Sequence, residues 1–432
     1  MKPRIIILMH YMELGGAEMS LIGLLGALDP TKVDVDLFVY SHQGPLMQFI
    51  PGHVNLLPEI PAYSVIERPM SEALRRGHVG VVAGRLLAKW KFRRFRRRNP
   101  AVGDDGAIQQ YVGDCVTPLL PPINPEVEYD LCISYLTPHN IGRDKVRARK
   151  RLAWIHTDYS TVDVDAEREL PVWGAYNHIA SISSDVTASF LKTFPSLKNK
   201  IIEIENIIPG DYVKSRAETP LGCDMTADVK PGHEVREITL LSIGRFAYQK
   251  NFDNIPSICR ELINLLSISR FCTAKNYDNA SEIMHRINTA GISDVKWYII
   301  GYGGGESLIR DKISEAGMEE HVILLGKKDN PYPYIKGCDI YVQPSRYEGK
   351  SITVREAQIL CKPVAVTDYP TAPSQIKNGV DGIIVPLDND GCARGLAHFI
   401  ADTELQSRIV DYLRTHDYAN TSEVEKIYDM LK

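Results

Sequence analysis

The chain has 432 residues with a net charge of −4, and 44% of its residues are hydrophobic and 24% charged. This length predicts two or three domains, and the composition is typical of a soluble globular protein. The near balance of charge excludes a global attraction to nucleic acid, so any basic surface must be local. The eight cysteines form no Cys-x-x-Cys pair, so no zinc site or other metal centre is predicted. No apolar run reaches the roughly 18 residues of a membrane span, and we expect a cytoplasmic protein.

Short apolar runs alternate with helical patterns along the first half of the chain. These runs predict strands at residues 5–9, 33–40, 131–135, 152–155, 179–182 and 200–204. Strands interleaved with helices indicate parallel βαβ units, so residues 1–217 are predicted to form one Rossmann-like domain. Residues 218–237 are polar, contain Pro and Gly, and show no period. We expect the interdomain linker there.

A second α/β series follows. It predicts strands at residues 238–243, 296–300, 322–325, 340–343, 363–366 and 382–385. Residues 238–401 are therefore expected to form a second Rossmann-like domain, and residues 402–432 a helical tail that could cross back to the first domain. The predicted fold class is α/β, with two doubly wound domains.

A tandem repeat interrupts the second series. Residues 240–264 and 265–289 align at an offset of 25 residues, so that Leu-Leu-Ser-Ile-Gly-Arg-Phe becomes Leu-Leu-Ser-Ile-Ser-Arg-Phe. The period is too short, and the copies too few, for a solenoid. One strand–loop–helix segment has been copied once.

Two glycine motifs could bring backbone close to a ligand. Gly15 and Gly16 stand between a strand and a helix start, where free N–H groups favour phosphate. Gly301 and Gly303 follow another predicted strand, but Glu306 stands where a dinucleotide fingerprint needs its last glycine. Ordinary tight turns would explain both motifs equally simply.

Two cations five residues apart could clamp a departing diphosphate. Arg245 and Lys250 follow the strand that ends in Gly244, and the second copy of the repeat offers Arg270 and Lys275 instead. We favour the first copy because Gly244 lets backbone approach phosphate. A solvated loop with two surface charges is the alternative.

Two carboxylates flank a helix start. Glu348 precedes Gly349, Lys350 and Ser351, and Glu356 lies about a turn and a half into the predicted helix. Ser351 is a plausible N-cap. Carboxylates accept paired hydrogen bonds from adjacent hydroxyls, so Glu356 suits a ribose and Glu348 a sugar ring. Compensation of the helix dipole would explain Glu356 without any ligand.

Two features of the first half complete the candidates. His156 ends a strand of an open α/β sheet, where ligands commonly bind, although a structural histidine is equally compatible. From Arg85 to Arg98 the chain carries eight basic residues and no acid, interleaved with Leu86, Leu87, Trp90, Phe92 and Phe95, whose aromatic rings would anchor the segment. This segment suits a helix on an anionic membrane surface. Nucleic acid and plain solvation are the alternatives.

Taken together, these motifs resemble glycosyltransferase family 4, with the GT-B fold of two Rossmann-like domains facing a central cleft. The resemblance rests on Gly15-Gly16, Gly244-Arg245-x4-Lys250-Asn251, Gly301-Tyr302-Gly303 and Glu348-x7-Glu356, and it covers nearly the whole chain. The chain is most similar to bacterial enzymes of surface-polysaccharide and lipid-linked oligosaccharide assembly, which carry a similar Trp-Ile-His-x-Asp-Tyr stretch.

The resemblance implies a retaining, metal-independent transfer of a hexose or N-acetylhexosamine, with no cofactor besides the donor. The donor would be a nucleotide sugar, with UDP as the expected nucleotide, and the acceptor a membrane-linked glycan in polysaccharide biosynthesis. The enzyme could then be peripheral on the inner face of the plasma membrane.

The resemblance also assigns roles to the domains and residues. The domain at residues 1–217 would bind the acceptor, and the domain at residues 238–401 the nucleotide sugar. Arg245 and Lys250 would hold the diphosphate, Glu356 the ribose and Glu348 the donor sugar. Gly16 and the backbone of 349–351 would approach the donor, and His156 would contact the transferred sugar.

Two departures leave alternatives open. Lys350-Ser351 replaces the family's Phe-Gly, and the repeat could distort the site. The chain could therefore be a nucleotide-sugar-binding protein without turnover, or a sugar-nucleotide epimerase on the same fold.

Overall fold

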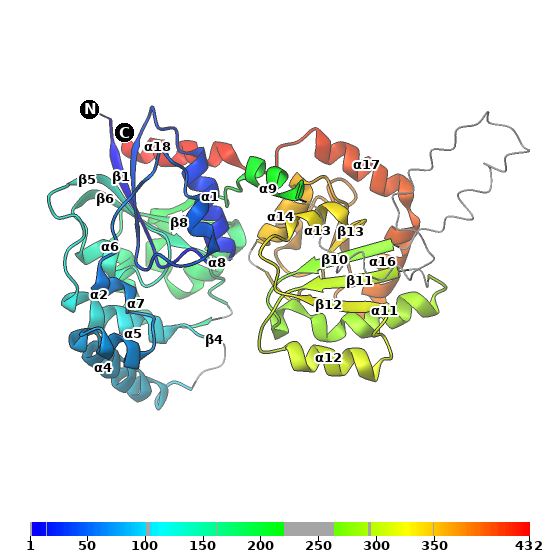
Figure 1. Ribbon diagram of the computed structural model, residues 1–432, viewed down its shortest axis with the longest axis horizontal. Coiled ribbons are helices and arrows are strands. Elements are labelled where there is room, and N and C mark those ends of the chain that lie inside the picture. The colour runs from blue at the N-terminus through cyan, green and yellow to red at the C-terminus, as the bar shows by residue number, and fades with distance from the viewer. Residues whose placement is uncertain are drawn as a thin grey trace, which may run out of the picture. The chain divides into compact units, whose positions relative to one another are not determined.

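The computed structural model describes residues 2–13, 15–100, 104–160, 162–219, 263–292, 295–348 and 350–432. The chain divides into two compact units, each built on one parallel sheet (Figure 1). Unit 1 comprises Met1–Pro209 and Ala419–Lys432, and unit 2 comprises Gly210–Tyr418. Most of the predicted linker, and all of the predicted strand at 238–243, lie outside the described residues.

The sheet of unit 1 has the order β3-β2-β1-β5-β6-β8-β9. Its strands are β1 Arg4–Met9, β2 Asp34–Val39, β3 Asn55–Leu56, β5 Tyr129–Ser134, β6 Ala148–Ile155, β8 His178–Ser181 and β9 Ile201–Glu203. Two short strands, β4 Asp104–Asp105 and β7 Val162–Asp163, pair separately. Every ladder is parallel, with β1 between β2 and β5. A strand in this central place is covered on both faces, so residues 5–9 are a continuous apolar run with almost no exposed surface.

The helices of unit 1 connect and cover these strands. They are α1 Gly16–Ala27, α2 Pro61–Ser64, α3 Met70–Arg75, α4 Val79–Arg96, α5 Ala107–Val116, α6 Asn140–Asp144, α7 Ala166–Gly174, α8 Ser184–Thr193 and α18 Glu425–Leu431. The last of these belongs to the returning segment, which is tied to the rest of the unit by polar contacts. The backbone N–H of Asp29 donates to Tyr428 Oη at 2.6 Å, and Lys150 Nζ donates to the carbonyl of Met430 at 2.7 Å.

The sheet of unit 2 has the order β12-β11-β10-β13-β14-β15 and is also parallel. Its strands are β10 Ile263–Ile268, β11 Val295–Ile300, β12 Val322–Gly326, β13 Ile340–Gln343, β14 Val364–Thr367 and β15 Ile383–Val385. Its helices are α9 Gly210–Ala217, α11 Ala280–Thr289, α12 Glu306–Glu315, α13 Tyr332–Gly337, α14 Ile352–Ile359, α15 Ala372–Gln375, α16 Asn389–Ala401 and α17 Thr403–Arg414.

The central strand of this sheet comes from the second copy of the repeat. β10 pairs with β11 on one side and β13 on the other, and its residues 265–267 are fully buried. No separate strand is predicted for this segment from the sequence, so β10 is an addition to the expected elements. The copy that leads directly into β11 thus occupies the middle of the sheet.

Among the described residues, no helix combines the length and apolar character that crossing a bilayer requires.

Candidate functional site

Two loops meet at the carboxyl edge of the unit 2 sheet, where parallel strands commonly present ligand-binding residues. One loop follows β10 and the other follows β13. Arg346 joins them, because its backbone N–H donates to the carbonyl of Ala274 at 2.8 Å and its guanidinium forms two hydrogen bonds to Asp278, at 2.9 and 2.7 Å. The hydrogen bonds to Arg346 are the largest influence on Asp278, and they lower the pKa of its carboxyl. A planar bidentate pair of this kind fixes orientation as well as distance.

An ion pair at this junction joins two of the predicted site residues. Lys275 Nζ donates to Glu348 Oε1, and both side chains are largely buried. The same oxygen accepts from Ser345 Oγ at 2.7 Å and from Gln343 Nε2 at 3.1 Å. Three donors on one oxygen hold Glu348 in a single orientation. The cation that reaches it comes from the second copy of the repeat.

The other members of the two cation pairs are less constrained or lie outside the described residues. Arg270 is exposed on the loop after β10. Arg245, Lys250 and Gly349 are not among the described residues, so the expectation that the first copy forms the clamp stays untested. The function proposed below uses the second copy instead, because its Lys275 contacts Glu348.

Glu356 lies on α14 and is almost completely buried, with 3% of its surface exposed. Tyr332 Oη, from the first turn of α13, donates to its Oε1 at 2.9 Å. Burial raises the pKa of Glu356 to about 7, and the single hydrogen bond from Tyr332 only partly opposes this shift. A buried carboxyl with capacity for further hydrogen bonds is a reasonable binding group for a diol.

The start of α14 is held by a partner that the sequence did not reveal. Ser351 stands at the N-cap position, as predicted, but its side chain makes no capping hydrogen bond. Instead its backbone N–H donates to Gln375 Oε1 at 3.0 Å, and Gln375 Nε2 donates to its carbonyl at 2.6 Å. Thr371 Oγ1 donates to the carbonyl of Glu348 at 2.8 Å. Neighbouring Lys350 is partly exposed. Residues from β14 onward therefore shape the loop that carries the predicted site.

The glycines after β11 serve close packing against the loop that follows β10. A Cβ on Gly301 would lie 2.1 Å from the carbonyl oxygen of Ser269, and one on Gly303 would lie 2.7 Å from that of Phe271. Gly303 also has a φ of +148°, which side chains rarely adopt. The structure therefore supplies a packing reason for these glycines, and their contact with a donor remains a prediction.

The glycines in unit 1 stand at the start of α1. Gly15 is the N-cap in extended conformation, and Gly16 begins the helix. Glu18 of the first turn folds back, so that a Cβ on Gly15 would lie 2.3 Å from Glu18 Oε2. A carboxylate of the protein itself therefore lies beside the helix start that was expected to receive phosphate.

His156 follows β6 and lies in an aromatic cluster. Its ring stacks on Trp154 at 5.8 Å and lies 4.6 Å from Tyr135. Burial lowers its pKa to about 3, so the imidazole is neutral at physiological pH. Its Nε2 is buried and has no hydrogen-bond partner among the described residues. A neutral ring with an unpaired nitrogen at a strand end is able to hydrogen-bond a sugar hydroxyl.

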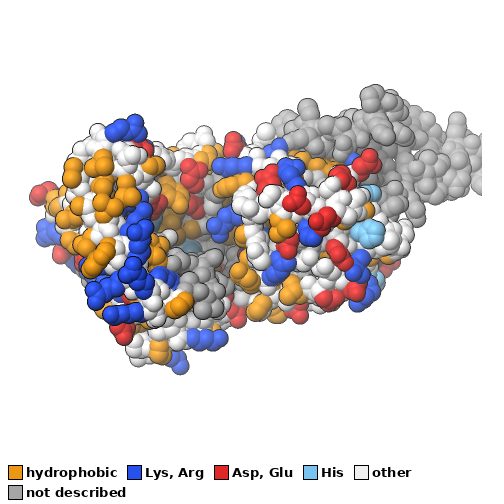
Figure 2. Space-filling view, turned by 90° about the horizontal axis from the view of Figure 1, so that it is seen from below, with side chains coloured by type: hydrophobic (Ala, Val, Ile, Leu, Met, Phe, Trp, Pro, Cys, Tyr) orange, Lys and Arg blue, Asp and Glu red, His pale blue; other side chains and the backbone are white. Residues whose placement is uncertain are grey.

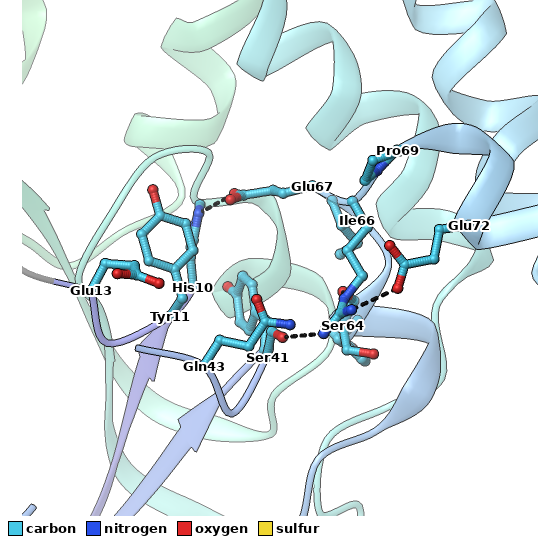
Figure 3. Close-up of a pocket in the computed structure, with 13 residues that line it drawn as sticks. His10, Tyr11, Glu13, Ser41, Gln43, Ser64, Ile66, Glu67, Pro69 and Glu72 are labelled. Atoms are coloured by element: carbon cyan, nitrogen blue, oxygen red, sulfur yellow. Dashed lines mark hydrogen bonds and ion pairs between the residues drawn. The ribbon is translucent and has the colours of Figure 1, made fainter. Parts of the chain in front are cut away.

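The carboxyl edge of the same sheet contains two adjoining cavities of about 400 and 420 Å³. Both are lined by His10 and Tyr11 after β1, Tyr40 after β2, and Ile66 and Glu67. Figure 3 shows the first of them. Thr157, next to His156, lines the second cavity. These cavities could not be foreseen from the sequence, because their residues lie in segments without a recognisable motif.

The basic segment forms α4, and its two faces differ. Phe92 and Phe95 pack against Tyr111 of α5, with ring centroids 5.9 Å apart in each pair. Leu86 and Trp90 are instead more than half exposed. The sequence pattern groups the aromatic residues of this segment together as surface anchors, and the structure removes the two phenylalanines from that group.

Two parallel, doubly wound sheets with helices on their faces define the GT-B fold of glycosyltransferases. Residues 260–416 match the family model of glycosyl transferases group 1. HepE of Anabaena, solved with UDP, is 15% identical to the chain with a TM-score of 0.58, covering 100% of this chain and 99% of that one. TarM of Staphylococcus aureus, solved as a mutant with fondaparinux, alpha-GlcNAc-glycerol and UDP, is 13% identical with a TM-score of 0.63 over 100% of both chains.

A curated relative is similar over a shorter stretch. It is the N-acetylgalactosamine-N,N'-diacetylbacillosaminyl-diphospho-undecaprenol 4-alpha-N-acetylgalactosaminyltransferase of Campylobacter jejuni, which is 28% identical over 125 residues. The match spans 28% of this chain and 34% of the relative, about a third of its length. The comparisons confirm the predicted resemblance to GT-B glycosyltransferases, whereas the family number 4 stays a prediction.

Proposed function

We propose that the chain is a retaining glycosyltransferase. It would move a hexose or N-acetylhexosamine from a UDP sugar to a membrane-linked glycan during polysaccharide biosynthesis, without a metal or other cofactor. The observation that carries this proposal is the buried Lys275–Glu348 pair, which lies within the stretch matched by the group 1 model. The complexes of HepE and TarM with UDP support the choice of donor nucleotide. The diphospho-undecaprenol in the Campylobacter enzyme's name supports a lipid-linked acceptor.

In this proposal Lys275 exchanges one anion for another. Without a donor, its charge is balanced by Glu348. A diphosphate entering beside it would compete for the same ammonium, with Arg270 adding a second cation. Glu348, still bound by Ser345 and Gln343, would then turn its free hydrogen-bonding capacity to the donor sugar. Cations that stabilise the departing diphosphate supply what a metal would otherwise provide.

Glu356 would bind the ribose, and His156 the transferred sugar. The leaving phosphate would accept the proton of the incoming hydroxyl, so no protein base is needed. A buried carboxyl must be ionised to accept both hydroxyls of a ribose, and this requirement links donor affinity to pH.

The exposed face of α4 would attach the protein to an anionic membrane surface. Val79, Leu86 and Trp90 recur at helical spacing on this face, and Arg93 and Arg97 continue it. Figure 2 shows lysine and arginine side chains running in a band beside hydrophobic ones on this side of unit 1. Apolar side chains that insert and cations that pair with lipid phosphates together define an interfacial helix. Each cation near such a surface contributes about 1 kcal/mol, so several give reversible attachment.

Vesicle sedimentation tests the membrane surface. Replacing Leu86, Leu87 and Trp90 together by Ser should release the protein from phosphatidylglycerol vesicles while leaving its melting temperature unchanged. The matched control replaces three exposed leucines elsewhere by Ser, namely Leu170, Leu308 and Leu387. Equal binding by the two triple variants would show that α4 is not the attachment surface.

Product analysis tests the enzymatic proposal. Purified protein is incubated with UDP-glucose, UDP-galactose and their N-acetylated counterparts, with and without undecaprenyl-linked glycans, and the products are identified by NMR. Transfer with retained anomeric configuration is expected. Nucleotide-sugar binding without turnover would identify a binding protein, and a changed sugar in the absence of acceptor would identify an epimerase. Either outcome would refute the proposed transfer.

A further inference from the structure

The two cavities of unit 1 share a wall built around one carboxylate. Glu67 reaches into the cavity region with about half of its side chain exposed, and its Oε1 lies 2.6 Å from His10 Nδ1 (Figure 3). No hydrogen bond joins Oε2 of Glu67 to any of the described residues. The chemistry proposed for the donor does not use this pair.

The chemistry of the pair can be derived from its surroundings. Burial raises the pKa of Glu67, but the hydrogen bond from His10 and the charges of His10 and Arg85 lower it more, so its pKa lies below the ordinary value. Glu67 is therefore a carboxylate at neutral pH and can only accept hydrogen bonds. It follows that His10 Nδ1 is the donor. The His10 side chain is buried, its ring stacks on Tyr40 at 4.9 Å, and its Nε2 has no partner among the described residues.

The cations around the cavities already have partners. Arg68 pairs with Glu72 at 2.7 Å, and Arg85 donates to the backbone carbonyls of Val65 and Arg68. The charge of Arg68 is thus balanced by Glu72, whereas the charge of Arg85 acts on Glu67. The half-buried ring of Tyr11 and the side chain of Ile66 add apolar surface to the wall. A fixed carboxylate beside an aromatic ring suits a ligand that donates hydrogen bonds, and the carboxylate would repel an anionic ligand.

We propose that Glu67 binds the hydroxyl groups of an uncharged sugar, and that His10 is the positioning residue that holds its carboxylate. Oε2 accepts from one or two adjacent hydroxyls, and Tyr11 packs against a face of the sugar ring. This proposal rests on the proposed function, because it takes the bound sugar to be the end of the acceptor glycan. The terminal sugar of the acceptor would then be uncharged.

Saturation-transfer NMR with simple sugars tests this site. The probes are the methyl α-glycosides of glucose, galactose, N-acetylglucosamine and N-acetylgalactosamine, with methyl α-glucuronide as the charged comparison. At least one neutral glycoside should bind the wild-type protein, and the glucuronide should not. Glu67→Gln should weaken that binding about tenfold or more, because it removes a charge-assisted hydrogen bond. Glu128→Gln, at an exposed pair with Arg149 near the start of β5, is the matched control and should bind as the wild type does.

Two variants of His10 distinguish its role in holding the Glu67 carboxylate from its contribution to the stability of the fold. Asn can place an N–H where imidazole Nδ1 stood, so His10→Asn should keep sugar binding, whereas His10→Leu should lose it to the same extent as Glu67→Gln. Both remove the stacking on Tyr40 and should lower the melting temperature alike. If the two variants bind sugar equally, His10 has only a structural role and the proposal is wrong. Absence of binding by every neutral glycoside, or equal binding by wild type and Glu67→Gln, would also overturn it.

A parallel titration with UDP keeps this inference separate from the proposed function. Glu67→Gln should leave UDP affinity unchanged in calorimetry. Failure of UDP to bind the wild type would count against the glycosyltransferase, whereas loss of the sugar signal alone counts against the Glu67 site.

Discussion

Replacing Glu356 by Gln should stabilise unit 2 at high pH and weaken its hold on nucleotide. The folded protein keeps a proton on Glu356 up to about pH 7, whereas the unfolded chain releases it near 4.5. The protonated carboxyl contributes its full stabilisation below the pKa that Glu356 has in the unfolded chain. This stabilisation is lost as the pH rises to the pKa that Glu356 has in the folded protein. The shift of about 2.5 units corresponds to about 3 kcal/mol at roughly 1.4 kcal/mol per unit.

The variant removes this pH dependence while keeping the local hydrogen bond. A Gln amide oxygen can still accept from Tyr332 Oη, so wild type and Glu356→Gln should be nearly equal at about pH 5. At about pH 8 the variant should be more stable by about 3 kcal/mol, which corresponds to roughly 6–12 °C in the melting temperature of a unit of this size. Differential scanning calorimetry at the two pH values measures the difference.

Nucleotide binding supplies the functional half of the prediction. Because a carboxylate accepts from a ribose diol more strongly than an amide does, Glu356→Gln should weaken UDP binding about tenfold or more at about pH 8. Wild-type affinity should also decrease as pH falls below about 7, because the proton competes with the ribose.

Unit 1 contains a matched control. Glu169 is buried beside Tyr159 and Trp173, and burial likewise raises its pKa to about 7. Glu169→Gln should reproduce the change in stability and leave UDP affinity intact. If Glu356→Gln shifts the melting temperature equally at both pH values, Glu356 is ionised throughout and the reasoning is refuted. Unchanged UDP affinity would refute only its role at the ribose.

Three further predictions concern unit 2 and the transfer reaction. Gly303→Ala should lower its melting temperature, because strained backbone costs about 1–3 kcal/mol and the new Cβ meets the Phe271 carbonyl, whereas Gly304→Ala, which meets no neighbouring atom within 4 Å, should have little effect. Lys275→Ala should weaken UDP binding in calorimetry by about tenfold or more. If Lys275→Ala binds UDP as the wild type does and Arg245→Ala shows the tenfold loss instead, the clamp lies in the first copy. Transfer activity should survive EDTA treatment, and loss of activity that Mg²⁺ or Mn²⁺ restores would contradict metal independence.

The sequence was sufficient to predict the fold because most of its central strands contain short, continuously apolar runs. The strand predicted at residues 340–343 has the bounds observed for β13, and the one predicted at residues 5–9 lies within one residue of those for β1. Full burial of a parallel strand leaves a local signature of this kind. The same rule missed β10, because its residues repeat those of the first copy and were assigned to the repeat alone.

The site was predictable only where its residues form motifs. The Glu348-x7-Glu356 spacing is visible in the sequence, but the partners that orient these residues are not. Ser345 and Gln343 lie nearby in sequence without a diagnostic pattern, whereas Gln375 reaches Ser351 from across a strand and a loop. Such contacts depend on the order of strands in the sheet, which a single sequence does not specify.

The aromatic residues of α4 illustrate the same limit at the scale of one helix. Phe92 and Phe95 differ from Trp90 by their angle around the helix axis, and the neighbouring α5 decides which side is covered. Composition alone assigns all three the same role.

The return of residues 419–432 to unit 1 makes unit 2 an insertion within it. During synthesis, residues 210–418 leave the ribosome before α18 does, so unit 2 has all of its residues while unit 1 still lacks a helix. Until then, the surface that later meets Tyr428 and Met430 stays uncovered. The order of synthesis therefore favours completion of unit 2 first, and a truncation after residue 418 would destabilise unit 1 near the opposite end of the polypeptide.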